Sequence, residues 1–242
     1  MSEAVKPVRR GDARRERWTS HRAQRHREFV DAALRVLEAA GPGLLMDSVA
    51  AEAGVSKPVL YRYFSDKTAL IQALDERASH ILLDQLMPAI EAATPPRIRV
   101  RDSVGAYFAV IDEHPNLYWL LARQANSGGP GSDAIQRYRD FVATALSVVI
   151  GEYLARLGLD PGAAEPWAHG ITGLVQSTGE WWLRRRSMNR AQVVEYVAQL
   201  IWAALSQLQA EAGIAAGQQW PSPPARPGRT ARAGRSGGNV GS

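Results

Sequence analysis

The 242-residue sequence predicts an all-α fold, with a small N-terminal helical unit followed by a larger helical body. Two observations support this prediction. Apolar residues recur at steps of three and four along most of the chain, which is the period of an amphipathic helix. The breaks between these segments, such as Gly41-Pro42-Gly43 and Pro95-Pro96, are rich in turn-forming residues. No convincing apolar-polar alternation typical of a strand interrupts this pattern.

The N-terminal unit is predicted to contain three helices. The first runs from about Ser20 to Ala39 and ends at the Gly-Pro-Gly stretch. A short helix follows at residues 46–53, Gly54 makes the turn, and a third helix spans residues 57–64 with Ser56 as its N-cap. Five apolar side chains are expected to hold this corner together: Val49, Ala50, Ala53, Val55 and Leu60. Two short helices around one glycine have helix-turn-helix spacing, although any two-helix corner can use the same turn.

The body begins with a long helix after Ser65, which can cap it, and Pro88 is expected to bend or end that helix. Five more helices are predicted from the apolar period, at residues 99–113, 116–125, 133–157, 163–186 and 190–212. The expected division of the chain is a basic disordered arm (1–19), the helix-turn-helix unit (20–66), the body (67–213) and a disordered basic tail (214–242).

Composition limits the classes of function. The chain has no cysteine, so disulfides, thiolate metal sites and a cysteine nucleophile are excluded. The histidines, including His114 and His169, show no ligand spacing and no nucleophile-base arrangement, so we expect no metal, no cofactor and no enzyme activity. The N-terminus is charged where a signal peptide is apolar, and no run reaches the roughly 20 apolar residues of a membrane span, which predicts a cytoplasmic protein.

Positive charge is concentrated at the two ends of the chain. Residues 1–27 hold nine Lys or Arg residues against three acidic residues, and residues 217–242 hold four arginines and no acidic residue. The C-terminal stretch is also rich in Pro, Gly and Ser, so it is predicted to be disordered. For the N-terminal arm two readings stay open, a contact with phosphate-rich partners and a solvated disordered tail.

The helical body holds two features of functional interest. The last two predicted helices have wide apolar faces, which suits either a dimer interface or one shared core. Aromatic side chains are dense among the middle helices, where they form either a plain core or the wall of a ligand pocket. The candidate pocket residues are Tyr107, Phe108, Ile111, Tyr118 and Trp119, with His114, Arg123, Gln176 and Glu180 as polar anchors. Such a pocket favours a small hydrophobic effector, such as an acyl chain, a steroid or an aromatic compound.

A longer pattern identifies the N-terminal unit more specifically. FVDAALRVLEAAG followed by MDSVAAEAGVSKPVLYRYFSDKTALIQAL resembles the DNA-binding domain of the TetR family of bacterial transcriptional regulators. The match runs from about residue 28 to residue 75 without a gap. The resemblance implies a homodimer that places two recognition helices in successive major grooves of a pseudo-palindromic double-stranded DNA operator. It also implies a divergent C-terminal domain for ligand binding, with the last two helices at the dimer interface.

The resemblance also implies which residues contact DNA. By position, the phosphate or base-edge contacts are Ser56, Lys57, Tyr61, Tyr63 and Lys67, and the residues against the groove are Pro58 and Val59. One departure is Leu45, which stands where the family commonly has a Thr or Ser that caps the second helix and binds phosphate. The arginine-rich arm (Arg9, Arg10, Arg14, Arg15, Arg17) is a candidate to replace that contact in a minor groove.

The favoured hypothesis is a ligand-responsive repressor that a small effector releases from its operator. Two alternatives stay open. One is a sequence-indifferent DNA-binding protein driven by the basic ends of the chain, and the other is a small helical enzyme. A footprint on a defined palindrome that survives moderate salt would exclude the first alternative. Turnover of a bound ligand would support the second.

Overall fold

The computed structural model describes residues 10–126 and 132–211, and every regular element in these ranges is helical. The elements in chain order are α1 (Arg10–Ala40), α2 (Met46–Glu52), α3 (Lys57–Tyr61), α4 (Lys67–Glu91), α5 (Pro96–Glu113), α6 (Pro115–Asn126), α7 (Ser132–Arg156), the short 3₁₀ helix η1 (Pro161–Ala163), α8 (Ala164–Arg185) and α9 (Arg190–Glu211). The predicted all-α fold is confirmed. None of the described helices is both long enough and apolar enough to cross a membrane.

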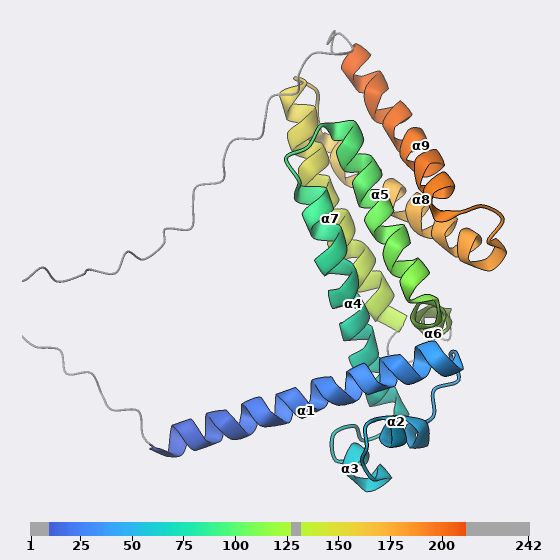
Figure 1. Ribbon diagram of the computed structural model, residues 1–242. Coiled ribbons are helices and arrows are strands. Elements are labelled where there is room, and N and C mark those ends of the chain that lie inside the picture. The colour runs from blue at the N-terminus through green and yellow to red at the C-terminus, as the bar shows by residue number, and fades with distance from the viewer. Residues whose placement is uncertain (1–9, 127–131, 212–242) are drawn as a thin grey trace, which may run out of the picture.

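The helices form a small base and a taller body (Figure 1). Helix α1 lies across the bottom of the body, and α2 and α3 lie beneath it. Helix α4 rises from this base and runs beside α5 and α7, while α8 and α9 pack on α7 and α5 respectively. Helix α6 lies at the lower end of the body and contacts both α1 and α7. The base is therefore tied to the body by α4 and α6.

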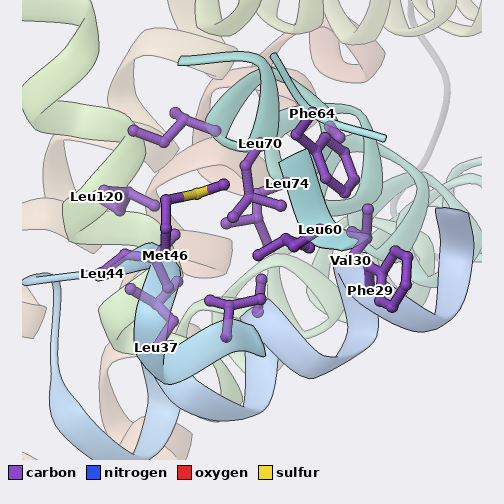
Figure 2. Close-up of a cluster of buried hydrophobic side chains, with 14 of the residues drawn as sticks. Phe29, Val30, Leu37, Leu44, Met46, Leu60, Phe64, Leu70, Leu74 and Leu120 are labelled. Carbon is purple, nitrogen blue, oxygen red and sulfur yellow. The ribbon is translucent and has the colours of Figure 1, made fainter. Parts of the chain in front are cut away.

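One buried cluster holds the base together and extends into the body (Figure 2). It contains Phe29 and Leu37 of α1 and Leu60 of α3, all of which are at most 1% exposed. Helix α4 adds Leu70 and Leu74, and α6 adds Leu117 and Leu120. The expected boundary at residue 66 therefore separates chain segments that share one core.

Helix α1 begins at Arg10, ten residues before its expected start at Ser20. The sequence between these positions holds four arginines, one alanine and one glutamate, which favour helix without producing an apolar period. A helix is about 10–12 Å wide and the minor groove is about 6 Å wide, so residues 10–19 do not fit that groove as a helix. Arg9 and the expected tail at 214–242 lie outside the described residues.

Helix α4 differs from expectation at both ends. Its N-cap is Asp66 rather than Ser65, because the Asp66 carboxylate accepts a hydrogen bond from the Ala69 N–H at 2.9 Å. Pro88 does not end the helix, which continues to Glu91. Leu86 and Ile90 on either side of the proline are buried, and this packing offsets the backbone hydrogen bond that proline removes.

Candidate nucleic-acid interface and ligand cavity

The turn between α2 and α3 has the geometry that its sequence predicts. Gly54 has φ +65°, a left-handed backbone conformation that residues other than glycine rarely adopt. The Val55 N–H donates to the Ala50 carbonyl at 2.9 Å, and the Gly54 N–H donates to the Ala51 carbonyl at 3.1 Å. These bonds end α2 and direct the chain into α3 at Ser56.

Helix α3 has only five residues, and two of them, Val59 and Leu60, pack against the core. Leu60 is fully buried, and it is the buried residue of this helix. An isolated helix this short is unstable in water, because the free-energy cost of nucleating a helix exceeds the stabilisation from so few hydrogen bonds. Packing through Leu60 and Val59 therefore holds α3 in place and fixes which of its side chains face solvent.

The structure brings the predicted DNA-contacting residues to one end of the base, with different exposures. Ser56, Lys57, Pro58, Tyr61 and Lys67 are exposed, whereas Val59 and Tyr63 are half-buried against the core. The Tyr63 ring packs edge-on against Phe29, with 4.9 Å between the ring centroids. Tyr61 is 40% exposed, and the Ser56 side chain makes no capping hydrogen bond. Five polar or small side chains of the predicted set are thus accessible to a partner.

An ion pair links the two short helices on this surface. The Lys57 ammonium lies 2.7 Å from a carboxylate oxygen of Asp47, which is in the first turn of α2. The hydrogen bond to Asp47 and its charge raise the pKa of Lys57. Both side chains are more than half exposed, so water screens their attraction. Asp47 places a negative charge beside a cation that the sequence predicts to contact DNA.

Leu45 occupies the N-cap of α2 in an extended conformation and makes no side-chain capping bond. Its side chain is 62% exposed. The sequence predicted that α2 lacks a polar N-cap side chain, and the structure agrees. The exposed apolar side chain of Leu45 lies at the start of the helix-turn-helix instead.

A second feature is a cavity enclosed by α4, α5, α7, α8 and α9. It holds about 130 Å³ of space open to the centres of water molecules, whereas one water needs roughly 10–15 Å³. Its wall is mostly aliphatic and aromatic, formed by Leu86, Ile90, Pro96, Val100, Val104, Tyr107, Val142, Leu146, Val149, Ile150, Tyr153, Ile171, Val175, Ile201 and Leu205. The polar side chains in the wall are Arg99, Ser103, Tyr138, Arg156, Thr172 and Gln176.

Several polar atoms of this wall are buried without a hydrogen-bond partner. They are the Arg99 Nε, the Tyr138 hydroxyl and the Thr172 hydroxyl. A buried polar group without a partner costs roughly 1–3 kcal/mol, so each such group in a native structure calls for an explanation. Three of them around one cavity are expected if a partly polar molecule binds there.

Of the predicted ligand residues whose side chains the structure describes, Tyr107 and Gln176 line the cavity and the others do not. Phe108 and Ile111 lie in the core of the body, against which Tyr118 and Trp119 pack half-buried. The remaining polar anchors have other surroundings. The His114 Nδ1 lies 3.4 Å from the Glu38 carboxylate, Glu180 pairs with Arg184, and the Arg123 side chain lies outside the described part of the structure.

Sequence reasoning missed both arginines of the cavity wall and two of its tyrosines, Tyr138 and Tyr153, although one signal was present. Along α7 the wall residues Tyr138, Val142, Leu146, Val149, Tyr153 and Arg156 follow at steps of three and four. This apolar helical stripe begins with a tyrosine and ends with the half-buried Arg156, and such polar ends on an apolar face were the signal.

Comparison with known proteins identifies the chain. Residues 85–217 match the family model described as the Tetracyclin repressor-like C-terminal domain, and residues 29–74 match the model for bacterial regulatory proteins of the tetR family. An uncharacterised HTH-type transcriptional regulator of Mycobacterium tuberculosis is 33% identical over 207 residues, which cover 85% of this chain and 88% of the relative. The chain belongs to the TetR family.

Further relatives of this TetR-family chain agree with that assignment. The HTH-type transcriptional activator FasR of Mycolicibacterium smegmatis is 32% identical over 74% of this chain and 78% of its own length. A crystal structure of a tetR-family transcriptional regulator from Streptomyces coelicolor matches with a TM-score of 0.64 and 27% identity, covering 79% of this chain and 86% of that one. A TetR-like regulator from Rhodococcus has the same fold, with a TM-score of 0.58 at 22% identity over 75% and 96% of the two chains.

Membership of the TetR family makes the chain a DNA-binding transcriptional regulator, and the family is one of regulators rather than enzymes. TetR regulators bind DNA and dimerise. The helix-turn-helix that the sequence predicted is the part of the chain that the family's DNA-binding model matches.

Restoring the usual TetR-family residue at position 45 should strengthen both the fold and DNA binding. In Leu45→Thr the hydroxyl can accept a hydrogen bond from an N–H of the first turn of α2, which typically stabilises by about 0.5–2 kcal/mol. We expect a higher urea midpoint and tighter operator binding in an anisotropy titration. Leu45→Ala is the matched control, because it removes the exposed leucine without supplying a cap. Equal stability of the two variants would contradict the capping argument.

Removing the carboxylate of Asp47 should tighten DNA binding. Asp47→Asn releases Lys57 and removes a negative charge, so we expect a roughly two- to fivefold lower Kd, the scale of an exposed ion pair. If Lys57 then neutralises one more phosphate, the plot of log K against log salt should steepen by about 0.9. The double variant Asp47→Asn/Lys57→Met should lose that increase. A salt slope that is identical in all three proteins would show that Lys57 does not reach a phosphate.

Proposed function

We propose that the protein is a homodimeric repressor that binds a palindromic operator through α3 and leaves it when a small hydrophobic effector enters the cavity of the body. The observation that carries this proposal is the path of α4. This helix begins at Lys67, beside the DNA-contacting surface, and ends among the cavity residues Leu86 and Ile90. A ligand that favours a different position of the far end of α4 would also change the position of α3.

The proposed operator contacts are the exposed residues Ser56, Lys57, Pro58, Tyr61 and Lys67, with the half-buried Val59 and Tyr63 at their edge. A major groove admits a helix of this size, and hydroxyl and ammonium donors on its face suit phosphates and base edges. This role would place the protein in the cytoplasm, where the operator lies.

The outward surface of α8 and α9 supports the proposed dimer. Trp181, Tyr196 and Leu200 are 40%, 58% and 58% exposed, so these large side chains are available to the helices of a partner subunit. Nearer the start of α8, Gly170 and Gly173 have open space around them, which would allow close approach of a partner helix. The inward face of the same helices packs into the body through Trp182, Val193 and Val197, among others. We therefore propose that the inward face of these helices completes the core and the outward face forms the dimer interface.

Footprinting on promoter DNA, combined with anisotropy titrations, tests the proposal. The protein should protect a defined palindrome with two half-sites about one or more helical turns apart, and protection should survive moderate salt. Removal of residues 1–19 should weaken binding without removing the footprint. A uniform, salt-sensitive coating of the DNA would favour the sequence-indifferent alternative instead.

A reporter gene under the footprinted promoter determines the direction of regulation. Repression predicts higher expression when the regulator is deleted. Activation is the second candidate, because the relative FasR is named a transcriptional activator and is 32% identical to this chain. Lower expression on deletion would establish that role in place of repression.

A further inference from the structure

The cavity of the body is long and chemically uneven. Its wall along α7 extends from Tyr138 to Arg156, which spans roughly 27 Å at a rise of about 1.5 Å per residue. Most of this length is lined by aliphatic side chains from α5, α7 and α8. The charged side chains of the wall, Arg99 of α5 and Arg156 of α7, lie where α5 begins and α7 ends, the end of the body farthest from α3 (Figure 1).

Arg99 is the unusual member of this pair. Its Nη2 donates a long 3.4 Å hydrogen bond to the Thr94 carbonyl, and its Nε is buried with no partner. Burial, together with the nearby charge of Arg156, lowers the pKa of Arg99. The Thr94 hydroxyl, in the same segment, is also buried without a partner. This end of the cavity therefore presents one hydrogen-bond donor, the Arg99 Nε, that no acceptor of the described chain satisfies.

The acidic group close to the two arginines does not remove this imbalance. Glu152 lies 3.6 Å from the Arg156 Nη2, its side chain is 63% exposed, and its charge opposes the lowering of the Arg99 pKa less strongly than burial and Arg156 cause it. Arg99 and Arg156 therefore bring two guanidinium charges to this end of the cavity. An anion that enters the cavity would meet both those charges and the open donor of Arg99, and bonds from Arg to a carboxylate or phosphate are among the strongest in proteins.

We propose that the effector is a single-chain amphiphile, with an anionic head bound at Arg99 and an aliphatic chain along the α7 stripe from Val142 to Tyr153. This inference rests on the proposed function, since it names the ligand class of the same cavity. Of the three hydrophobic effectors that the sequence favours, an acyl chain can follow a wall of this length, whereas a steroid or an aromatic compound is shorter. The half-buried Arg99, with its buried Nε, adds the requirement for a negative charge.

Three probes with the same twelve-carbon chain separate the head group from the chain: dodecanoic acid, dodecanol and dodecyltrimethylammonium. Isothermal titration of the purified full-length protein, below the micelle concentration of each probe, should show dodecanoic acid binding at least tenfold tighter than dodecanol. The cationic probe should bind least tightly. Dodecyl phosphate in the same titration distinguishes a carboxylate site from a phosphate site, and tight binding of either supports an anionic head.

Variants at position 99 test the assigned residue. Arg99→Met keeps the length and apolar stem of the side chain, so it should still bind dodecanol while losing the preference for the acid. Arg99→Lys keeps the charge and should retain most of that preference, and urea unfolding curves confirm that both variants are folded. Equal binding of the acid and the alcohol by the unchanged protein would overturn the inference and leave the hydrophobic effector site intact. Failure of every probe to bind would overturn both.

Discussion

Alanine in place of Leu60 should abolish operator binding and destabilise the protein by about 2–5 kcal/mol. The Leu60 side chain is fully buried in the cluster that joins α1, α3, α4 and α6, where loss of its methyl groups leaves a cavity. Because Leu60 is the buried anchor of a five-residue helix, its loss should also release α3 from the position that presents Tyr61. Urea unfolding measures the first effect, and an anisotropy titration with the operator measures the second.

A neighbouring variant separates folding from recognition. Tyr61→Phe removes only the hydroxyl of a side chain that is 40% exposed, so it should leave the free energy of unfolding nearly unchanged. Its operator affinity should fall by roughly 1–2 kcal/mol if the hydroxyl binds a charged phosphate. If Leu60→Ala kept full affinity at a temperature where it is folded, the account of α3 as a helix positioned by Leu60 would be wrong.

The predictable parts of this protein were those set by local sequence. Gly54 identified the turn because it alone tolerates a left-handed conformation cheaply, and Leu60, Val49 and Ala50 identified the buried side of the corner. Element ends were less predictable where competing effects were of similar size. Ser65 and Asp66 can both cap a helix, and in the structure the N-cap residue is Asp66. Pro88 disfavours a helix by about 3 kcal/mol, but burial of Leu86 and Ile90 offsets that cost.

The ligand cavity was harder to predict because its wall comes from five helices that are distant in sequence. Aromatic density correctly indicated a large apolar cluster, yet Phe108 and Trp182 pack against each other and fill their own space. Whether such a residue lines a cavity depends on how α5, α7 and α8 approach one another. The helical period fixes which face of each helix is apolar, and leaves open the spacing of the helices.

Gly179 is the position where helix spacing can be tested directly, because two glycine substitutions should have opposite signs. A Cβ added at Gly179 of α8 would lie 2.8 Å from the Tyr107 ring and 2.9 Å from the Ile111 Cδ1. Tyr107 and Ile111 are both buried, and a rigid ring cannot absorb such a contact by rotating its end. Overpacking of this kind destabilises by about 1–3 kcal/mol. Replacing glycine by alanine in a helix stabilises by roughly 1 kcal/mol through helix propensity, so the net effect should be destabilising.

Gly105→Ala is the matched control for Gly179→Ala. A Cβ at Gly105 of α5 would meet only the Val194 Cγ1, at an ordinary 3.8 Å, so alanine there should stabilise by about 0.5–1 kcal/mol. Urea unfolding at one protein concentration should therefore rank Gly105→Ala above the unchanged protein and Gly179→Ala below it. Because Tyr107 also lines the cavity, its displacement in Gly179→Ala should weaken binding of dodecanoic acid, whereas Gly105→Ala should bind it normally. Stabilisation by both alanines would mean that α5 and α8 lie farther apart than described, and the cavity between them would then be wider.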